Sequence, residues 1–253
     1  MKLIVNGDDF GITKACNYAI IDCFKNGILR STSMMMNMPD VEHAALLMKQ
    51  YPKLSVGIHF NLTVGKPLTN CPSLCKEDGT FNKGNLKNSD HVKMEEIRQE
   101  LQAQYDRFVE VTGQKPHHLN SHHGICLIQG GEQAQLELAE KYQLPIRQMI
   151  TSLIRKEETK SPYGVTKMTP MTMSNEFLTP QKMMASFTKE MLESDDVYEF
   201  AAHPGYVDYD LTKVSSLLEG RYHDAYTFMS DEIKNWVKEN NIELVDYREI
   251  LKK

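Results

Sequence analysis

Residues 3–12, LIVNGDDFGI, lead an apolar run directly into two adjacent carboxylates, Asp8 and Asp9. Three consecutive apolar residues at the start of this stretch are typical of a buried β-strand. Two neighbouring negative charges repel each other, and each is costly to place beside an apolar core. We therefore expect a positively charged partner where this strand ends.

Strand-like and helical segments alternate from this first strand to the end of the chain. Runs typical of strands occur at 2–6, 31–37, 54–60, 117–123, 144–148, 197–204 and 242–245. Apolar residues at helical spacing predict helices at 13–26, 40–51, 93–112, 131–142 and 180–193, and a last helix that carries Ala225 through Val237. Such alternation favours an α/β fold with a parallel sheet, and 253 residues suit closure into a TIM-like (β/α) barrel of about seven parallel strands. A doubly wound open sheet is the alternative.

The pattern indicates one catalytic domain over residues 1–253, with one long interruption. Residues 65–92 are rich in Pro, Gly, Asn and Lys, and we expect a loop or lid insertion there. Residues 149–178 are rich in Met, Ser and Thr and give no clear period. Neither a GxGxxG motif nor a Walker loop occurs, so a nucleotide cofactor has no support.

Composition narrows the class of protein. The net charge is −5 with no basic block, which argues against nucleic acid as a partner. No run reaches the roughly 18 apolar residues of a membrane helix, and the first residues are strand-like, so we expect a cytoplasmic protein that does not enter membranes. Five cysteines without a CxxC pair argue against a disulfide framework or a cysteine-based zinc site.

Charged or titratable side chains follow several different predicted strands. They are Asp8, Asp9, His59, His122, His123, Arg147 and His203. In a parallel barrel the carboxyl ends of all strands face the same mouth, so these residues are expected to converge. An aspartate with two histidines suits Zn²⁺, Mn²⁺, Fe²⁺ or Co²⁺, and Mg²⁺ less well. Adjacent residues of an extended strand point to opposite faces, so we expect one aspartate to bind the ion and the other to approach a bound water.

Each of these residues also has a simpler interpretation. An Asp-Asp pair is common at turns and helix starts, a single histidine such as His59 is often only buried, and clustered histidines are often a solvated surface. His203, followed by Pro and Gly, fits an ordinary turn. Their joint occurrence at strand ends favours a metal-dependent active site over these separate explanations.

Six segments together resemble one known family, the YdjC-like carbohydrate deacetylases, which include chitooligosaccharide deacetylase. They are VNGDDFGIT, NGILRSTSMMMN, VGIHFNLTVGKPL, KPHHLNSHHGI, LPIRQ and AAHPGYVD, spread from residue 5 to 208. The resemblance implies a deformed (β/α) barrel, a divalent metal (Mg²⁺ or Zn²⁺), a homodimer, and hydrolysis of N-acetyl groups on sugars.

The resemblance also implies roles for single residues. By motif position the metal ligands correspond to Asp9, His59 and His122. Asp8 corresponds to the catalytic base, His203 to the general acid, and Arg147 to a polar position near the base. Apart from the resemblance, candidates for contact with the sugar are Phe10, Asn61, His123 and Tyr206, and packing is the alternative for the aromatic residues Phe10 and Tyr206. Many relatives have a third histidine where this chain has Gly124, so a substrate contact from that position is open.

The sequence thus predicts a metal-dependent carbohydrate deacetylase that acts on acetylated amino sugars or oligosaccharides in oligosaccharide degradation. Two alternatives stay open. One is another metal-dependent hydrolase, acting on a phosphoester or a non-sugar amide. The other is a sugar- or metal-binding protein without catalysis.

Overall fold

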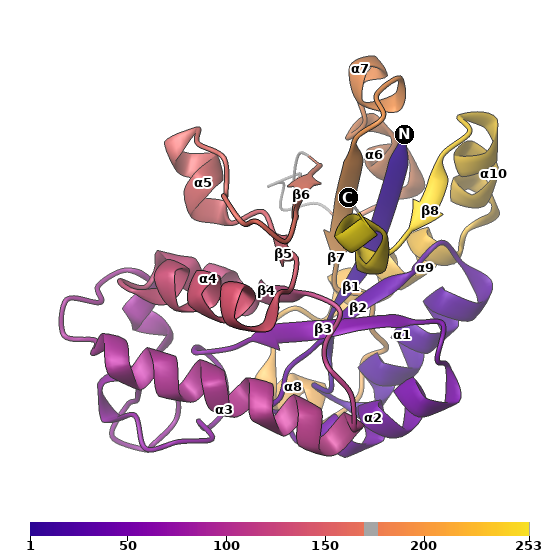
Figure 1. Cartoon of the computed structure of the whole chain (residues 1–253). Helices are drawn as coiled ribbons and strands as arrows, with labels where there is room; N and C mark the ends of the chain where they lie inside the picture. The colour runs from indigo at the N-terminus through magenta and orange to yellow at the C-terminus, as the bar shows by residue number, and fades with distance from the viewer. Residues whose placement is uncertain (170–176, 253) are drawn as a thin grey trace.

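The computed structural model of the chain describes residues 1–169 and 177–252, and its strands are all parallel (Figure 1). The strands are β1 (Lys2–Phe10), β2 (Ser31–Met34), β3 (Ser55–Phe60), β4 (Leu119–Ser121), β5 (Ile146–Arg147), β6 (Val165–Met168), β7 (Val197–Ala202) and β8 (Glu243–Val245). Residues 170–176, part of the stretch that the sequence left unassigned, lie outside the description. Neighbouring parallel strands are joined by crossover connections, mostly helices, so strands and helices alternate along the sequence as predicted.

Seven of these strands close into a ring. The order is β2-β3-β4-β5-β6-β7-β1, and β1 pairs back onto β2. β8 lies on the same edge of β1 as β2 but pairs with its first residues, Lys2 to Ile4, whereas β2 joins β1 only from Asn6 onward. The predicted deformed barrel of about seven parallel strands is therefore confirmed. The deformation arises because two strands share one edge of β1.

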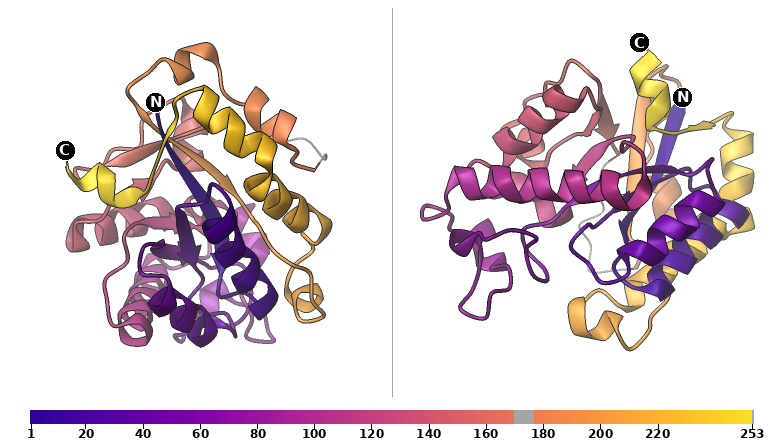
Figure 2. Two further views of the ribbon diagram at one scale, coloured as in Figure 1. Left: turned by 90° about the vertical axis from the view of Figure 1, so that its right-hand side faces the viewer. Right: turned by 60° about the horizontal axis from the view of Figure 1, so that its bottom comes forward.

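Helices cover the outside of the ring (Figures 1 and 2). The α-helices are α1 (Lys14–Asn26), α2 (Val41–Gln50), α3 (Met94–Thr112), α4 (Gly131–Tyr142), α5 (Ile150–Arg155), α6 (Pro180–Ala185), α7 (Lys189–Leu192), α8 (Leu211–Val214), α9 (Glu219–Met229) and α10 (Asp231–Glu239). Short 3₁₀ turns form η1 (Pro72–Leu74), η2 (Lys83–Leu86), η3 (His122–Leu127) and η4 (Tyr247–Lys252). No described helix has the length and apolarity needed to cross a membrane.

Two helices that the sequence predicted as continuous are each divided by a capping residue. Ser230 ends α9, and its side chain accepts a hydrogen bond from the backbone N–H of Ile233 in α10. Thr188 caps α7 in the same way, which separates that helix from α6. Short hydroxyl side chains compete for backbone hydrogen bonds, so they favour helix starts over helix interiors. Apolar periodicity alone does not reveal such breaks.

The two faces of the strands have different chemistry. Outward residues belong to one apolar cluster with the helices, among them Val5, Val56, Ile58, Leu119, Ile146 and Phe200. The alternate residues on the same strands contact one another inside the ring, among them Asn6, Asp8, Ser33, His59, Asn120, Arg147 and Glu199. A period of two thus sends apolar side chains to the helices and polar ones to the interior. The site is built on this polar lining.

The segment 65–92 is a packed loop rather than an open one. The carboxylate of Glu100 on α3 accepts hydrogen bonds from the backbone N–H groups of Leu68 and Thr69. Phe81 is fully buried in the main apolar cluster. Further along the loop, Lys83 Nζ lies 3.3 Å from Nε2 of His123. The loop therefore reaches from α3 to a residue of the candidate site.

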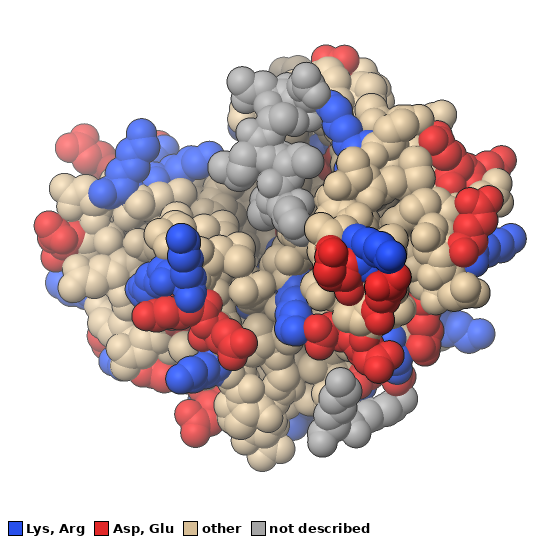
Figure 3. Space-filling model, turned by 90° about the horizontal axis from the view of Figure 1, so that it is seen from above, with Lys and Arg blue, Asp and Glu red and all other residues tan. Residues whose placement is uncertain are grey.

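The face seen in Figure 3 carries acidic and basic side chains in alternation. Among its described residues no single sign of charge covers the surface. Binding of nucleic acid depends on a continuous basic surface. This face therefore does not offer the electrostatic attraction that such binding requires.

The interior of the ring gives the first prediction. A Cβ atom at Gly57 would lie 2.4 Å from the ring of His118, which is fully buried. We expect Gly57→Ala to lower the free energy of unfolding by about 1–3 kcal/mol through overpacking, measured by urea denaturation. In a His118→Ala background the same change should cost much less, because the clash is gone. Equal losses in the two backgrounds would contradict this packing.

Candidate active site

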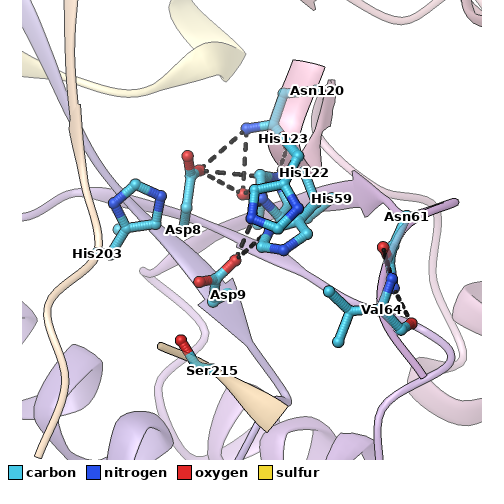
Figure 4. A network of polar contacts seen from close by, with 12 residues as sticks. Asp8, Asp9, His59, Asn61, Val64, Asn120, His122, His123, His203 and Ser215 are labelled. Atoms are coloured by element: carbon cyan, nitrogen blue, oxygen red, sulfur yellow. Dashed lines mark hydrogen bonds and ion pairs between the residues drawn. The ribbon is translucent and has the colours of Figure 1, made fainter. Parts of the chain in front are cut away.

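Three side chains from separate segments meet at the carboxyl end of the barrel (Figure 4). Asp9 comes from the end of β1, His59 from β3, and His122 from the start of η3 directly after β4. Asp9 Oδ1 lies 3.0 Å from His122 Nδ1 and 3.3 Å from His59 Nε2. The three ligand atoms lie within 4.8 Å of one another. This spacing matches atoms that share one metal ion with bonds of about 2 Å.

The same three atoms are buried and make no hydrogen bond within the described structure. On the other side of the His59 ring, Nδ1 lies 2.7 Å from Asn120 Oδ1, an acceptor. Nδ1 therefore carries the proton, and Nε2 presents a lone pair toward Asp9. Buried polar atoms without partners are costly, and a divalent cation would satisfy all three at once. The residues present thus fit a metal ion.

Asp8 and Asp9 both face the site, although they are adjacent in sequence (Figure 4). The expectation that they would point to opposite faces is wrong because β1 is not extended at its end. Asp9 has φ of +70°, and the pairing with β2 shifts register between Gly7 and Phe10. This bulge turns the second carboxylate back toward the first. The residue with the strained backbone is therefore Asp9, which is itself a proposed metal ligand.

Asp9 is held by a buried arginine on its other oxygen. Arg221 Nη2 donates to Asp9 Oδ2 at 2.7 Å, and both side chains are almost completely buried. Burial alone would raise the pKa of Asp9, but His122 and Arg221 outweigh it and hold that pKa well below its usual range. Asp9 therefore stays ionised, with Oδ1 directed at the two histidines.

Asp8 has a different set of partners. Arg147 donates from Nη1 to Oδ2 at 2.7 Å and from Nη2 to Oδ1 at 2.9 Å. Asn6 and Ser33 each donate to Oδ1 at 2.8 Å. Burial would raise the pKa of Asp8, but the Arg147 guanidinium and His59 outweigh it, so the pKa lies far below its usual value. Asp8 is thus an ionised carboxylate beside the ion site and outside the ligand set.

An open cleft of about 430 Å³ leads to these groups. Its lining includes Asp8, His59, His123, Arg147 and His203. In Figure 4 the His203 ring lies beside Asp8. Burial lowers the pKa of His203 from its ordinary value, and the nearby carboxylates Asp9 and Asp8 oppose this shift. An imidazolium in such a place gives up its proton readily.

The four residues named from the sequence as substrate contacts do not share one environment. Phe10 has no exposed surface and packs in the apolar core, so it offers no face to a sugar. Asn61 is also fully buried, and its side chain joins Asn37 to the turn at Val64. In this structure both side chains organise the structure behind the site, and for Phe10 this matches the alternative interpretation as a packing residue.

The other two candidates are accessible. His123 lines the cleft, with its Nδ1 held 3.0 Å from Thr63 Oγ1. Tyr206 is 37% exposed, and its hydroxyl donates to Asp22 at 2.8 Å; it does not line the cleft. Only His123 is therefore placed to meet a molecule in the cleft.

Gly124 has φ of +65°, and a Cβ atom there would lie 2.8 Å from Cδ1 of Ile150. A side chain at this position would need the Ile150 side chain to move, and the positive φ would strain the backbone. Ile150, which also lines the cleft, occupies the adjacent space. Where many relatives have a third histidine, this chain therefore has a glycine packed against the apolar side chain of Ile150.

Two almost fully buried charged residues that hold charged side chains of the site were not anticipated from the sequence. Glu199 lies between apolar and aromatic residues in β7. A carboxylate inside such a strand needs a buried polar partner, and the sequence alone could have indicated this. Arg221 is on α9, before the region where the apolar period was detected, and its neighbours give no comparable signal. Both contact a site residue, since Glu199 holds Arg147 and Arg221 holds Asp9.

Comparison with known proteins shows similarity over nearly the whole chain. The pattern of the family described as YdjC-like protein matches residues 2–239. Carbohydrate deacetylase 2 of Listeria innocua is 35% identical, covering 100% of both chains. Chitooligosaccharide deacetylase of Proteus mirabilis is 32% identical, covering 98% of both. A crystal structure from Enterococcus faecalis V583, provisionally assigned to cellobiose-phosphate cleavage, has a TM-score of 0.85 at 28% identity, covering 99% of this chain and 98% of the other.

The Asp9–Arg221 pair gives a prediction about stability. Arg221→Met leaves the Asp9 carboxylate buried without its cation, and we expect a loss of about 3–5 kcal/mol in the free energy of unfolding. The measurement is urea denaturation in the presence of a chelator. The matched control is Arg107→Met, whose pair with Glu42 is at the surface and should contribute less than about 1 kcal/mol. Similar small losses in both variants would contradict the structural role given to Arg221.

Proposed function

This chain belongs to the family of YdjC-like proteins, and we propose that it is a metal-dependent carbohydrate deacetylase that hydrolyses N-acetyl groups of amino sugars or oligosaccharides. The observation that carries the proposal is an ionised carboxylate, Asp8, directly beside a complete Asp-His-His ligand set. A protein that only binds a metal or a sugar needs the ligands but has no use for this second carboxylate. The names of the deacetylase relatives support the same reaction class.

The proposed ligand set is Asp9, His59 and His122, with one divalent ion. Two imidazoles with one carboxylate favour Zn²⁺ over Mg²⁺. When bound, the ion would polarise the acetyl carbonyl and lower the pKa of a water molecule. The homodimer that the family resemblance implies is part of the proposal and rests on that resemblance alone.

Asp8 would orient the attacking water and accept its proton. Its strongly lowered pKa makes it a weak base, so it depends on a water that the ion has already acidified. Arg147 keeps the Asp8 carboxylate ionised and in plane through two charge-assisted hydrogen bonds. This arrangement separates binding of the ion, by Asp9, from proton transfer, by Asp8.

His203 would donate a proton to the amine as the amide bond breaks. An amide nitrogen leaves poorly without protonation, and His203 lines the same cleft as Asp8. Because the pKa of His203 is lowered, its imidazolium form is more acidic and donates its proton more readily. Asp8 would then accept the proton of the attacking water, and His203 would donate a proton to the leaving amine of the same amide bond.

Phosphoester hydrolysis is the competing reaction class, and the name attached to the Enterococcus structure refers to a sugar phosphate. Phosphoesterases of this kind commonly use two metal ions about 4 Å apart. Within the described ranges, Asp9, His59 and His122 are the one group that meets the ligand spacing. Amide hydrolysis with a single ion therefore fits the site better.

Metal content tests the ligand set. We expect about one divalent ion per chain after gentle purification, measured by elemental analysis, and a loss of most of it in His59→Ala or His122→Ala, since each removes one of three protein ligands. The matched control is His91→Ala, an exposed histidine of the loop 65–92, which should keep the ion. Wild-type metal content in His59→Ala would exclude this site.

Asp8→Asn tests the base. The change keeps the shape of the side chain and removes its charge, so we expect acetate release from N-acetylglucosamine oligomers to fall by about 10²–10⁴-fold with metal content unchanged. Asp210→Asn, an exposed aspartate, serves as the control. Full activity in Asp8→Asn would disprove the assignment, and release of phosphate from sugar phosphates without any acetate release would favour the competing class.

A further inference from the structure

Another buried carboxylate lies behind the proposed base Asp8, on the other side of Arg147. Glu199 is fully buried in β7. Its Oε1 accepts from Arg147 Nε at 2.9 Å and from Arg147 Nη2 at 2.7 Å. Its Oε2 accepts from the hydroxyl groups of Thr166, at 2.7 Å, and Tyr247. All four contacts come from donors, which is the environment of an ionised carboxylate.

Arg147 needs such an anchor because its own strand is very short. β5 has two residues, with one paired position on β4 and two on β6. β7, by contrast, pairs with β1 at six positions. A side chain fixed to β7 can therefore hold the guanidinium more firmly than the backbone of β5 does. Tyr247 and Thr166 in turn hold Glu199 from elements on two sides.

The geometry of the guanidinium transmits this constraint. Glu199 takes the edge formed by Nε and Nη2, and Asp8 takes the edge formed by Nη1 and Nη2. The group is planar and rigid, so fixing one edge fixes the direction of the other. Glu199 does not itself line the cleft, and it is not one of the three proposed ligands. Whatever it does for catalysis acts through Arg147.

We propose that Glu199 is a positioning residue: it sets the plane of Arg147 so that both oxygens of Asp8 are held in the orientation that proton transfer requires. The inference rests on the proposed deacetylase function. A positioning role differs from a role in folding alone. Positioning requires Glu199 to reach the Nε–Nη2 edge of Arg147, whereas a folding role does not depend on which edge it reaches. Reach and charge can be separated by two substitutions.

Glu199→Asp keeps the charge but shortens the side chain by one methylene, so it loses reach. Glu199→Gln keeps the reach, because its amide oxygen can accept from Arg147 while its amide N–H groups face hydroxyls able to accept. We expect kcat for acetate release to fall about 10- to 100-fold in Glu199→Asp and less than about fivefold in Glu199→Gln. KM and metal content should stay near the wild-type values in both. The control is Glu243→Gln, an exposed strand carboxylate on β8.

The reverse order of the two variants would overturn the proposal, since it would mean that charge and not position matters. So would a Glu199→Asp variant with wild-type kcat, or one in which KM alone changes. Arg147→Lys gives a second test, because a lysine has no planar fork to position. In that background Glu199→Asp should change kcat less than twofold, and a full independent loss would contradict action through Arg147.

Crystal structures of the variants separate this inference from the proposed function. If the wild type releases no acetate from any acetylated sugar, the deacetylase proposal fails, and the positions of Arg147 and Asp8 then decide the inference. It stands if the Arg147 Nη atoms lie within hydrogen-bond distance of Asp8 in Glu199→Gln and beyond it in Glu199→Asp. It falls if both contacts are unchanged in Glu199→Asp.

Discussion

The pairing of two adjacent buried carboxylates with two separate arginines is the constraint on which the site depends. Asp8 and Asp9 are each less than 5% exposed, and like charges at this separation are unfavourable without cations. Arg147 reaches Asp8 from β5, and Arg221 reaches Asp9 from α9. Two segments that lie far from β1 in the sequence therefore contact it through charge as well as through apolar packing. Removing either arginine would leave an uncompensated buried charge.

The polar interior follows from this constraint. TIM-type barrels usually fill their interior with layers of branched apolar side chains. Here Asn6, Ser33 and Asn120 point inward and donate to Asp8, while the apolar side chains of the same strands face the helices. A polar interior is stable only when its groups are satisfied. The unpaired atoms of Asp9, His59 and His122 lie within 4.8 Å of one another, and together they mark where an ion would complete the network.

The periodicity of apolar residues and the positions of strand ends made it possible to predict the fold and part of the candidate site from the sequence. His59 and His122 were found because parallel strands bring their carboxyl ends together, which requires only the alternation of elements. The burial of Phe10 and Asn61 was not predictable, because nearness in sequence to a proposed ligand does not tell which face of the strand a side chain takes. Arg221 was missed because it lies within helix α9 and not at the end of a strand, and its neighbours there give no signal. The bulge at Asp9 was invisible, since positive φ at an aspartate has no signature in composition.

The different roles proposed for the two aspartates follow from the number of donors at each carboxylate oxygen. Asp8 Oδ1 receives hydrogen bonds from Asn6, Ser33, Asn120 and Arg147, so its lone pairs are used. Asp8 Oδ2 receives one, from Arg147 Nη1, among the described residues. A carboxylate oxygen has two lone pairs, so Oδ2 is the atom with room to bind a water and take its proton. Asp9 shows the complementary pattern, with Oδ2 held by Arg221 and Oδ1 left for an ion. In the proposed function one arginine would thus orient the base and the other the metal ligand, and the bulge at Asp9 lets both carboxylates face the position of the proposed cation.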